Sequence, residues 1–151
     1  MKKILLKFLT IETIETSPAD MEHALRVATA VLLVEVTRAD FIVDPSEKQR
    51  LRELLRQQFN LSAQELDALQ EEAEADADRM VSMQHVNRLL KEHYDHAKNR
   101  RIIEMMWHLV YADGEMDHYE EHLIRQFADL LYVSHSVFIL SRHKAEAENG
   151  S

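Results

Sequence analysis

The sequence predicts an all-α protein, a compact array of about seven or eight helices, and three observations indicate this class. Only two glycines and two prolines occur in 151 residues, so the chain has little of the turn chemistry that β-structure requires. Hydrophobic residues make up 46% and charged residues 30%, which is typical of a globular protein and too apolar for disorder. Helix caps recur along the whole chain.

Start signals place the helices in the first half of the chain. Residues 1–16 read as an N-terminal amphipathic segment, and a single helical domain is expected over 17–147 with a flexible tail at 148–151. Ser17-Pro18 offers a cap and a proline at the first helical position, which opens a helix to about residue 39. Asp44-Pro45 repeats this pattern for a helix to about residue 59. Ser62 and Glu65 form a capping box for a helix that reaches about residue 74.

The second half continues in the same way. A helix beginning at Ser82 carries Val86, Leu89 and Leu90, and another is expected from about residue 97 to 112. Asp117 opens a helix to about residue 131, and the last runs from 134 to about 147. The segments 24–36 and 102–110 are apolar around nearly their whole circumference, which predicts two central buried helices. We expect their polar exceptions, Glu35, Glu104 and His108, to face a helix end or to pair with a neighbour. The side chains expected in the core are Leu33, Val36, Met106, Trp107 and Leu109.

An internal duplication is the most informative feature of the sequence. Residues 39–47 align without gaps on residues 112–120, an offset of 73 residues between Asp40 and Asp113. The register continues downstream, where Leu51 matches Ile124. The chain therefore reads as two copies of a unit made of a buried helix, an acidic loop and an amphipathic helix, arranged around a pseudo-twofold axis.

Each loop carries the pattern Asp-x-x-x-Asp-x-x-Glu. Its second Asp suits a helix N-cap and its Glu completes a capping box, whereas its first Asp follows a helix end, where a negative charge is unfavourable. Gly114 suits a left-handed turn in the second copy, and Phe41 replaces that glycine in the first. The acids concerned are Asp40, Asp44, Glu47, Asp113, Asp117 and Glu120.

Residues 110–124, which contain Ala112-Asp113-Gly114 followed by Asp117 and Glu120, resemble the hallmark of the TerB family, the tellurite-resistance protein B group. That group also includes the N-terminal region of a membrane-anchored DnaJ-like co-chaperone. The resemblance covers roughly residues 20–141, and Phe41 departs from the hallmark. It implies a duplicated helical fold, an association with tellurite or other chemical stress, and acids that bind divalent cations.

Two readings of the six acids stay open. The first hypothesis is a calcium or magnesium site. Calcium takes six to eight oxygen ligands, and one loop offers only three carboxylates, whereas two adjacent loops would offer six. The other is that the acids only cap helices and the chain docks a protein partner of a stress-response assembly. A distant third hypothesis is a zinc hydrolase, because residues 118–122 spell H-x-x-E-H with His118 and His122 one turn apart.

Charge and composition exclude several classes. A net charge of -9 repels nucleic acid, and no segment approaches the roughly 20 apolar residues of a transmembrane helix. The chain has no cysteine, which removes disulfides and thiol nucleophiles and fits a cytoplasmic protein. No credible catalytic constellation occurs, so we expect a binding module and not an enzyme.

Overall fold

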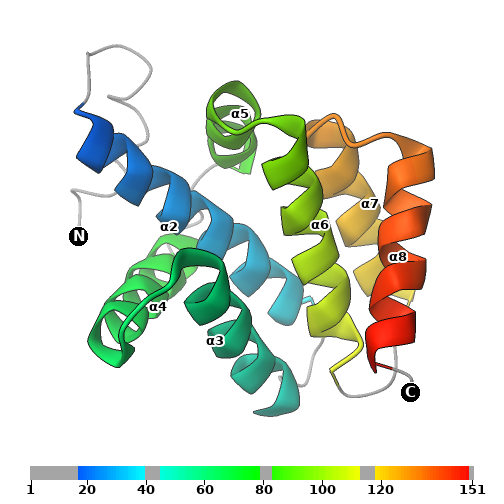
Figure 1. The fold of residues 1–151 in the computed structure, drawn as a ribbon, viewed down its shortest axis with the longest axis horizontal. Coiled ribbons are helices and arrows are strands. Elements are labelled where there is room, and N and C mark those ends of the chain that lie inside the picture. Colours follow the sequence, from blue (N-terminus) through cyan, green and yellow to red (C-terminus); the bar gives the residue numbers. More distant parts are fainter. Residues whose placement is uncertain (1–16, 40–44, 79–82, 113–117, 150–151) are drawn as a thin grey trace.

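The computed structural model describes residues 17–39, 45–78, 83–112 and 118–149, and all regular structure in these ranges is α-helical (Figure 1). The predicted all-α class is confirmed. The N-terminal segment and the middle of both acidic loops lie outside the described residues. The helices are α2 (Pro18–Thr37), α3 (Pro45–Phe59), α4 (Ala63–Asp78), α5 (Met83–His93), α6 (His96–Val110), α7 (His118–Leu130) and α8 (His135–Asn149).

Some helices extend beyond their predicted ends, because buried or capping side chains stabilise the additional residues. Helix α4 runs to Asp78, four residues beyond the expected end, because Ala73 and Ala77 continue its buried face. Helix α6 begins at His96 because the Asp95 side chain caps it, accepting a hydrogen bond from the Lys98 amide at 2.8 Å. Helix α8 continues to residue 149, past the expected end at 147. None of the helices in the described ranges is long and apolar enough to cross a membrane.

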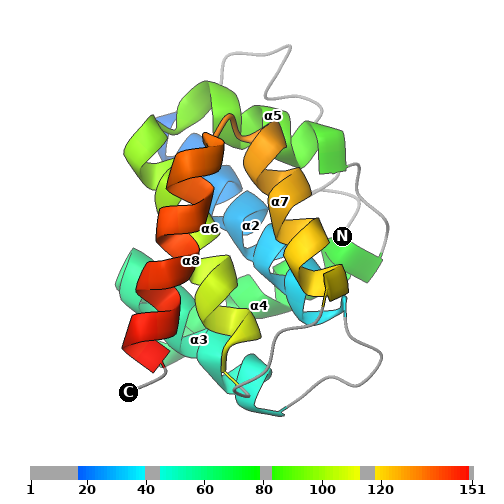
Figure 2. The ribbon, with the colours of Figure 1, turned by 90° about the vertical axis from the view of Figure 1, so that its right-hand side faces the viewer.

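Helices α2 and α6 form the centre of the molecule, as predicted. Helix α2 packs against α3, α4, α5 and α6, and α6 packs against α3, α7 and α8 as well. Figure 2 shows α7 and α8 side by side on one face, with α2 and α6 behind them. The side chains predicted for the core are all fully buried: Leu33, Val36, Met106, Trp107 and Leu109. Burial of apolar surface by this helix pair is the main stabilising contribution to the fold.

The helix contacts follow the predicted duplication. Helix α2 contacts α3 and α4 in the first unit, and α6 contacts α7 and α8 in the second. The contacts between the units are reciprocal, because α3 packs on α6 and α7 packs on α2. Helix α5, whose apolar face contacts α2 and α7, stands between the two units. This arrangement places equivalent segments of the two copies in equivalent surroundings.

The duplication extends beyond the segment that the sequence alignment covered. Ser62 and Ser134 begin α4 and α8 with the same cap: the amides of Glu65 and Val137 donate to the two hydroxyl groups at 3.2 and 3.3 Å. Just before these serines, Leu61 and Val133 donate backbone hydrogen bonds five residues back, to Arg56 and Ala128. Each preceding residue has positive φ, 52° at Asn60 and 57° at Tyr132, as a Schellman helix end requires.

These caps are 72 residues apart, whereas the acidic motifs are 73 apart. The second unit therefore lacks one residue between its acidic motif and its final helix. That single deletion explains why a gap-free alignment loses α8, although α8 occupies the place of α4.

Candidate functional site

The structure describes two of the six predicted site residues. Glu47 and Glu120 lie at the third position of α3 and α7, whereas Asp40, Asp44, Asp113 and Asp117 lie outside the described residues. Both glutamates are buried, with exposed fractions of 1% and 3%. A carboxylate removed from water must be compensated by hydrogen bonds or opposite charge. The two motifs thus share a feature that an ordinary surface helix cap does not have.

The capping box of α4 provides the comparison within this chain. Glu65 accepts from the Ser62 amide at 3.0 Å, and the Ser62 hydroxyl accepts from the Glu65 amide at 3.2 Å, which confirms the predicted box. Glu65 is exposed, and the hydrogen bond from the Ser62 backbone lowers the pKa of its carboxyl. Capping a helix in this protein therefore does not require a buried glutamate.

Both acidic loops leave their helices through the same backbone geometry. At the end of α2, the amides of Arg38 and Ala39 donate to Val34 and Val36 at 3.0 and 3.2 Å. The matching amides at the end of α6, those of residues 111 and 112, donate to residues 107 and 109, both at 3.1 Å. The loops thus begin at equivalent positions, and both start in the lower half of the views in Figures 1 and 2.

The side chains beside the two loops are different. Tyr111 donates to Glu146 at 2.7 Å, and Arg142 donates to both the Tyr111 hydroxyl at 3.0 Å and Glu146 at 2.9 Å. Burial raises the pKa of the Tyr111 hydroxyl, and the hydrogen bond from Tyr111 lowers the pKa of Glu146. In the first unit the matching residue is Arg38, which pairs with Asp78 of α4 at 2.8 Å. The Tyr111 network was not predicted, because Tyr111 is 31 residues before Arg142 and 35 before Glu146 in the sequence and no pattern links them.

Glu35, Glu104 and His108, the polar residues singled out in the apolar segments, each pair with a neighbour or lie near a helix end, as expected. Glu104 lies 3.2 Å from Arg101 and 3.6 Å from Lys144, and His108 lies 3.6 Å from Glu148, so both pair with neighbours. Burial lowers the pKa of His108. Glu35 is half-buried near the end of α2, and its burial raises the pKa of its carboxyl.

The H-x-x-E-H pattern lies on the outer side of α7. His118 and His122 are both exposed, and His118 lies 4.0 Å from Glu121. Within the described ranges, no group of three or more His, Asp or Glu side chains could hold a metal ion. This pattern therefore has no third ligand in the part of the chain that the structure describes.

Opposite charges on α3 and α4 meet in the structure. Arg52 donates to Asp67 at 2.7 Å and to Gln70 at 2.6 Å. Both charged side chains of this pair are more than a third exposed, at 39% and 67%. Such a pair contributes at most about 1 kcal/mol to stability.

Comparison with known proteins identifies one family. The family model described as tellurite resistance protein TerB matches residues 26–143, which span both repeat units. No significant match was found among curated proteins or among solved structures.

Proposed function

We propose, because the chain belongs to the TerB family of tellurite resistance proteins, that it is a cytoplasmic binding module without catalytic activity. In this proposal its two acidic loops take up a divalent cation such as calcium or magnesium. The candidate ligands are the six acids of the two motifs. The chain would act in resistance to tellurite or related chemical stress.

The burial of Glu47 and Glu120 is the observation that carries this proposal. The two carboxylates occupy equivalent places in the two units and are almost completely removed from water. Each follows an Asp by three residues, and each motif places three of the six candidate acids within a short stretch of sequence. A divalent cation would offset the repulsion between these charges, and carboxylate oxygens are the ligands that calcium and magnesium prefer.

Thermal denaturation in millimolar calcium, magnesium or manganese tests the proposal. A cation that binds the folded chain raises its melting temperature by mass action. Asp113→Asn should abolish this increase and leave the stability of the metal-free protein nearly unchanged, because it removes only a ligand and a charge unfavourable at a helix end. Asp40→Asn makes the same test of the first loop, in which Phe41 replaces the glycine. We expect the loop with Gly114 to bind more tightly, since glycine lets backbone carbonyls turn toward an ion.

Glu65→Gln is the matched control. It removes a carboxylate at the same position of a helix, but from an exposed capping box. Its melting temperature should respond to the cation as the native protein does. A melting temperature that no cation changes would contradict the proposal.

A second candidate function is the docking of a protein partner of a stress-response assembly. The observation that favours it is apolar surface on the last two helices: Leu140 is 66% exposed and Leu130 is 44% exposed. In this case Leu140→Ser would weaken association with the partner and leave both the melting temperature and its response to cations unchanged.

A further inference from the structure

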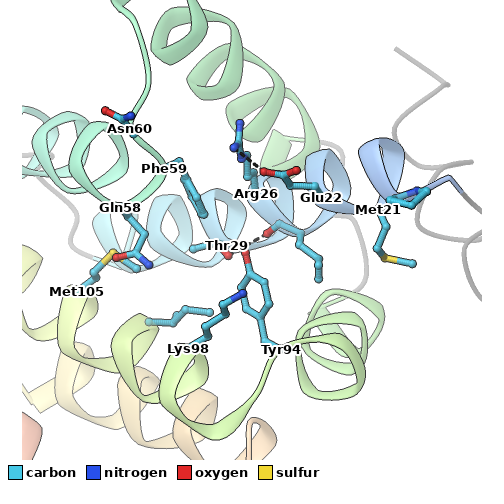
Figure 3. A pocket seen from close by; sticks show the side chains of 13 residues that line it. Met21, Glu22, Arg26, Thr29, Gln58, Phe59, Asn60, Tyr94, Lys98 and Met105 are labelled. Atoms are coloured by element: carbon cyan, nitrogen blue, oxygen red, sulfur yellow. Dashed lines mark hydrogen bonds and ion pairs between the residues drawn. The ribbon is translucent and has the colours of Figure 1, made fainter.

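A pocket of about 550 Å³ lies at the far ends of the central helices from the acidic loops (Figure 3). Its walls come from the first half of α2, the last turn of α3, the α5–α6 connection and the first half of α6. Both loops follow the opposite, C-terminal ends of α2 and α6. The pocket therefore belongs to a different part of the molecule from the proposed cation site.

The volume and walls are typical of a small-molecule site. Ligand pockets run from roughly 300 to 1,000 Å³ and combine apolar walls with a few polar groups. The apolar lining includes Leu25, Ile102 and Met105, together with the rings of Phe59 and Tyr94. An apolar group of a ligand would be shielded from water on several sides.

The polar lining is cationic on balance. Arg26 pairs with Glu22 at 2.7 Å and lies over the Phe59 ring, 5.5 Å from its centroid. Lys98 lies over the Tyr94 ring at 5.1 Å, and no carboxylate within the described ranges is at ion-pair distance from its ammonium group. The two cations and one carboxylate leave a net positive charge at the pocket.

Tyr94 is held in place at the centre of this arrangement. Its side chain lies against Thr29, whose hydroxyl donates to the Leu25 carbonyl at 2.9 Å. Figure 3 shows Tyr94 pointing toward Thr29, with Lys98 beside Tyr94 and Arg26 on the opposite side of Thr29. The aromatic wall and the cation above it are thus positioned before any ligand arrives.

From these observations we infer that the pocket binds a small amphipathic anion, a carboxylate attached to an aromatic or aliphatic body. The carboxylate pairs with the ammonium group of Lys98 and meets the positive charge of Arg26. The apolar body lies between the Phe59 and Tyr94 rings, against Ile102 and Met105.

The second repeat unit contains a related pocket with different chemistry. Its volume is about 530 Å³, and its lining includes Tyr132, which has a positive φ as Asn60 of the first pocket does. Tyr132 is 66% exposed, and Lys91 covers its ring at 4.2 Å while donating to its hydroxyl at 3.1 Å. Tyr132 therefore provides no enclosed aromatic wall. Lys91 lies on this ring without lining the pocket, and it provides a control for Lys98, which lies on the Tyr94 ring.

Methionine methyl NMR on the full chain can locate the binding. Met21 and Met105 line the first pocket, whereas Met106 is buried and does not line it. The probes are 4-phenylbutyrate, 4-phenylbutanol and 4-phenylbutylamine, which share a body and differ in charge. We expect 4-phenylbutyrate to shift the Met21 and Met105 signals in a saturable way, with at least tenfold weaker binding of the alcohol and the amine.

Lys98→Met should weaken the binding of 4-phenylbutyrate about tenfold and remove its advantage over the alcohol. Lys91→Met removes another exposed lysine that lies over a tyrosine ring, and it should change neither property. Both lysines are exposed, so neither substitution threatens the fold. The inference is overturned if 4-phenylbutyrate leaves Met21 and Met105 unchanged, if all three probes bind equally, or if Lys91→Met has the same effect as Lys98→Met.

Discussion

At the scale of single residues, burial separates what the sequence could predict from what it could not. Trp107 was predictable as a core residue because apolar side chains surround its helix on all sides. The burial of Glu47 was not predictable, because its local pattern is the same as that of Glu65, a capping glutamate. Glu47 is buried on α3, which packs against α2 and α6, whereas Glu65 is exposed on α4.

Trp107 provides the first prediction at this scale. Its indole is fully buried and packs against Phe138, with ring centroids 5.1 Å apart. Trp107→Ala should lower the free energy of unfolding by about 3 to 5 kcal/mol, measured by chemical denaturation, because it leaves a cavity between α6 and α8. Trp107→Phe keeps a ring in that space and should cost less. A loss below about 1 kcal/mol for Trp107→Ala would show that the indole does not support the core.

His108 predicts how stability depends on pH. Burial lowers the pKa of its imidazole in the folded state below the ordinary 6.5, so the unfolded chain takes up the proton more readily. The stability associated with a neutral His108 is therefore complete above pH 6.5 and declines as the pH falls toward the folded-state pKa. Denaturant titrations between pH 7.5 and 5 should show a smaller decline for His108→Gln than for the native chain. Equal declines in the two proteins would contradict this account.

At the scale of elements, capping residues set most of the helix boundaries. The predicted starts at Ser17 and Ser62 are confirmed by hydrogen bonds to the amides three residues later. The predicted start near residue 97 is one residue late, because Asp95 caps the helix and places its first residue at His96. The end of α4 was placed too early, since an acidic run alone does not reveal that its alanines face the core.

The equivalence of the caps of α4 and α8 gives an element-scale prediction. Ser62→Ala and Ser134→Ala should each lower the free energy of unfolding by about 0.5 to 2 kcal/mol, because each leaves a first-turn amide without its acceptor. Ser136→Ala, two residues beyond the second cap, should have a much smaller effect. Chemical denaturation of the three variants provides the comparison. A Ser134→Ala cost no larger than that of Ser136→Ala would argue against equivalent caps.

At the scale of the whole molecule, duplication explains why so much of the architecture could be predicted. The repeat in the sequence indicated that α2 matches α6 and α3 matches α7, and the two apolar helices indicated the centre. The candidate small-molecule pocket could not be predicted in this way, because its lining comes from three separate stretches of chain. The local sequence around Tyr94 and Lys98 does not mark them as binding residues. Only the fold brings them to the same pocket as Arg26 and Phe59.

The central claim is that the paired acidic motifs hold a divalent cation. Isothermal titration of calcium into the metal-free native chain tests it most directly, with magnesium and manganese as parallel titrants. We predict a saturable binding heat that is lost in the double variant Glu47→Gln, Glu120→Gln and kept in Glu65→Gln, with circular dichroism showing that each variant is folded. Heats of dilution alone for all three cations, or an equal loss of binding in Glu65→Gln, would contradict the claim.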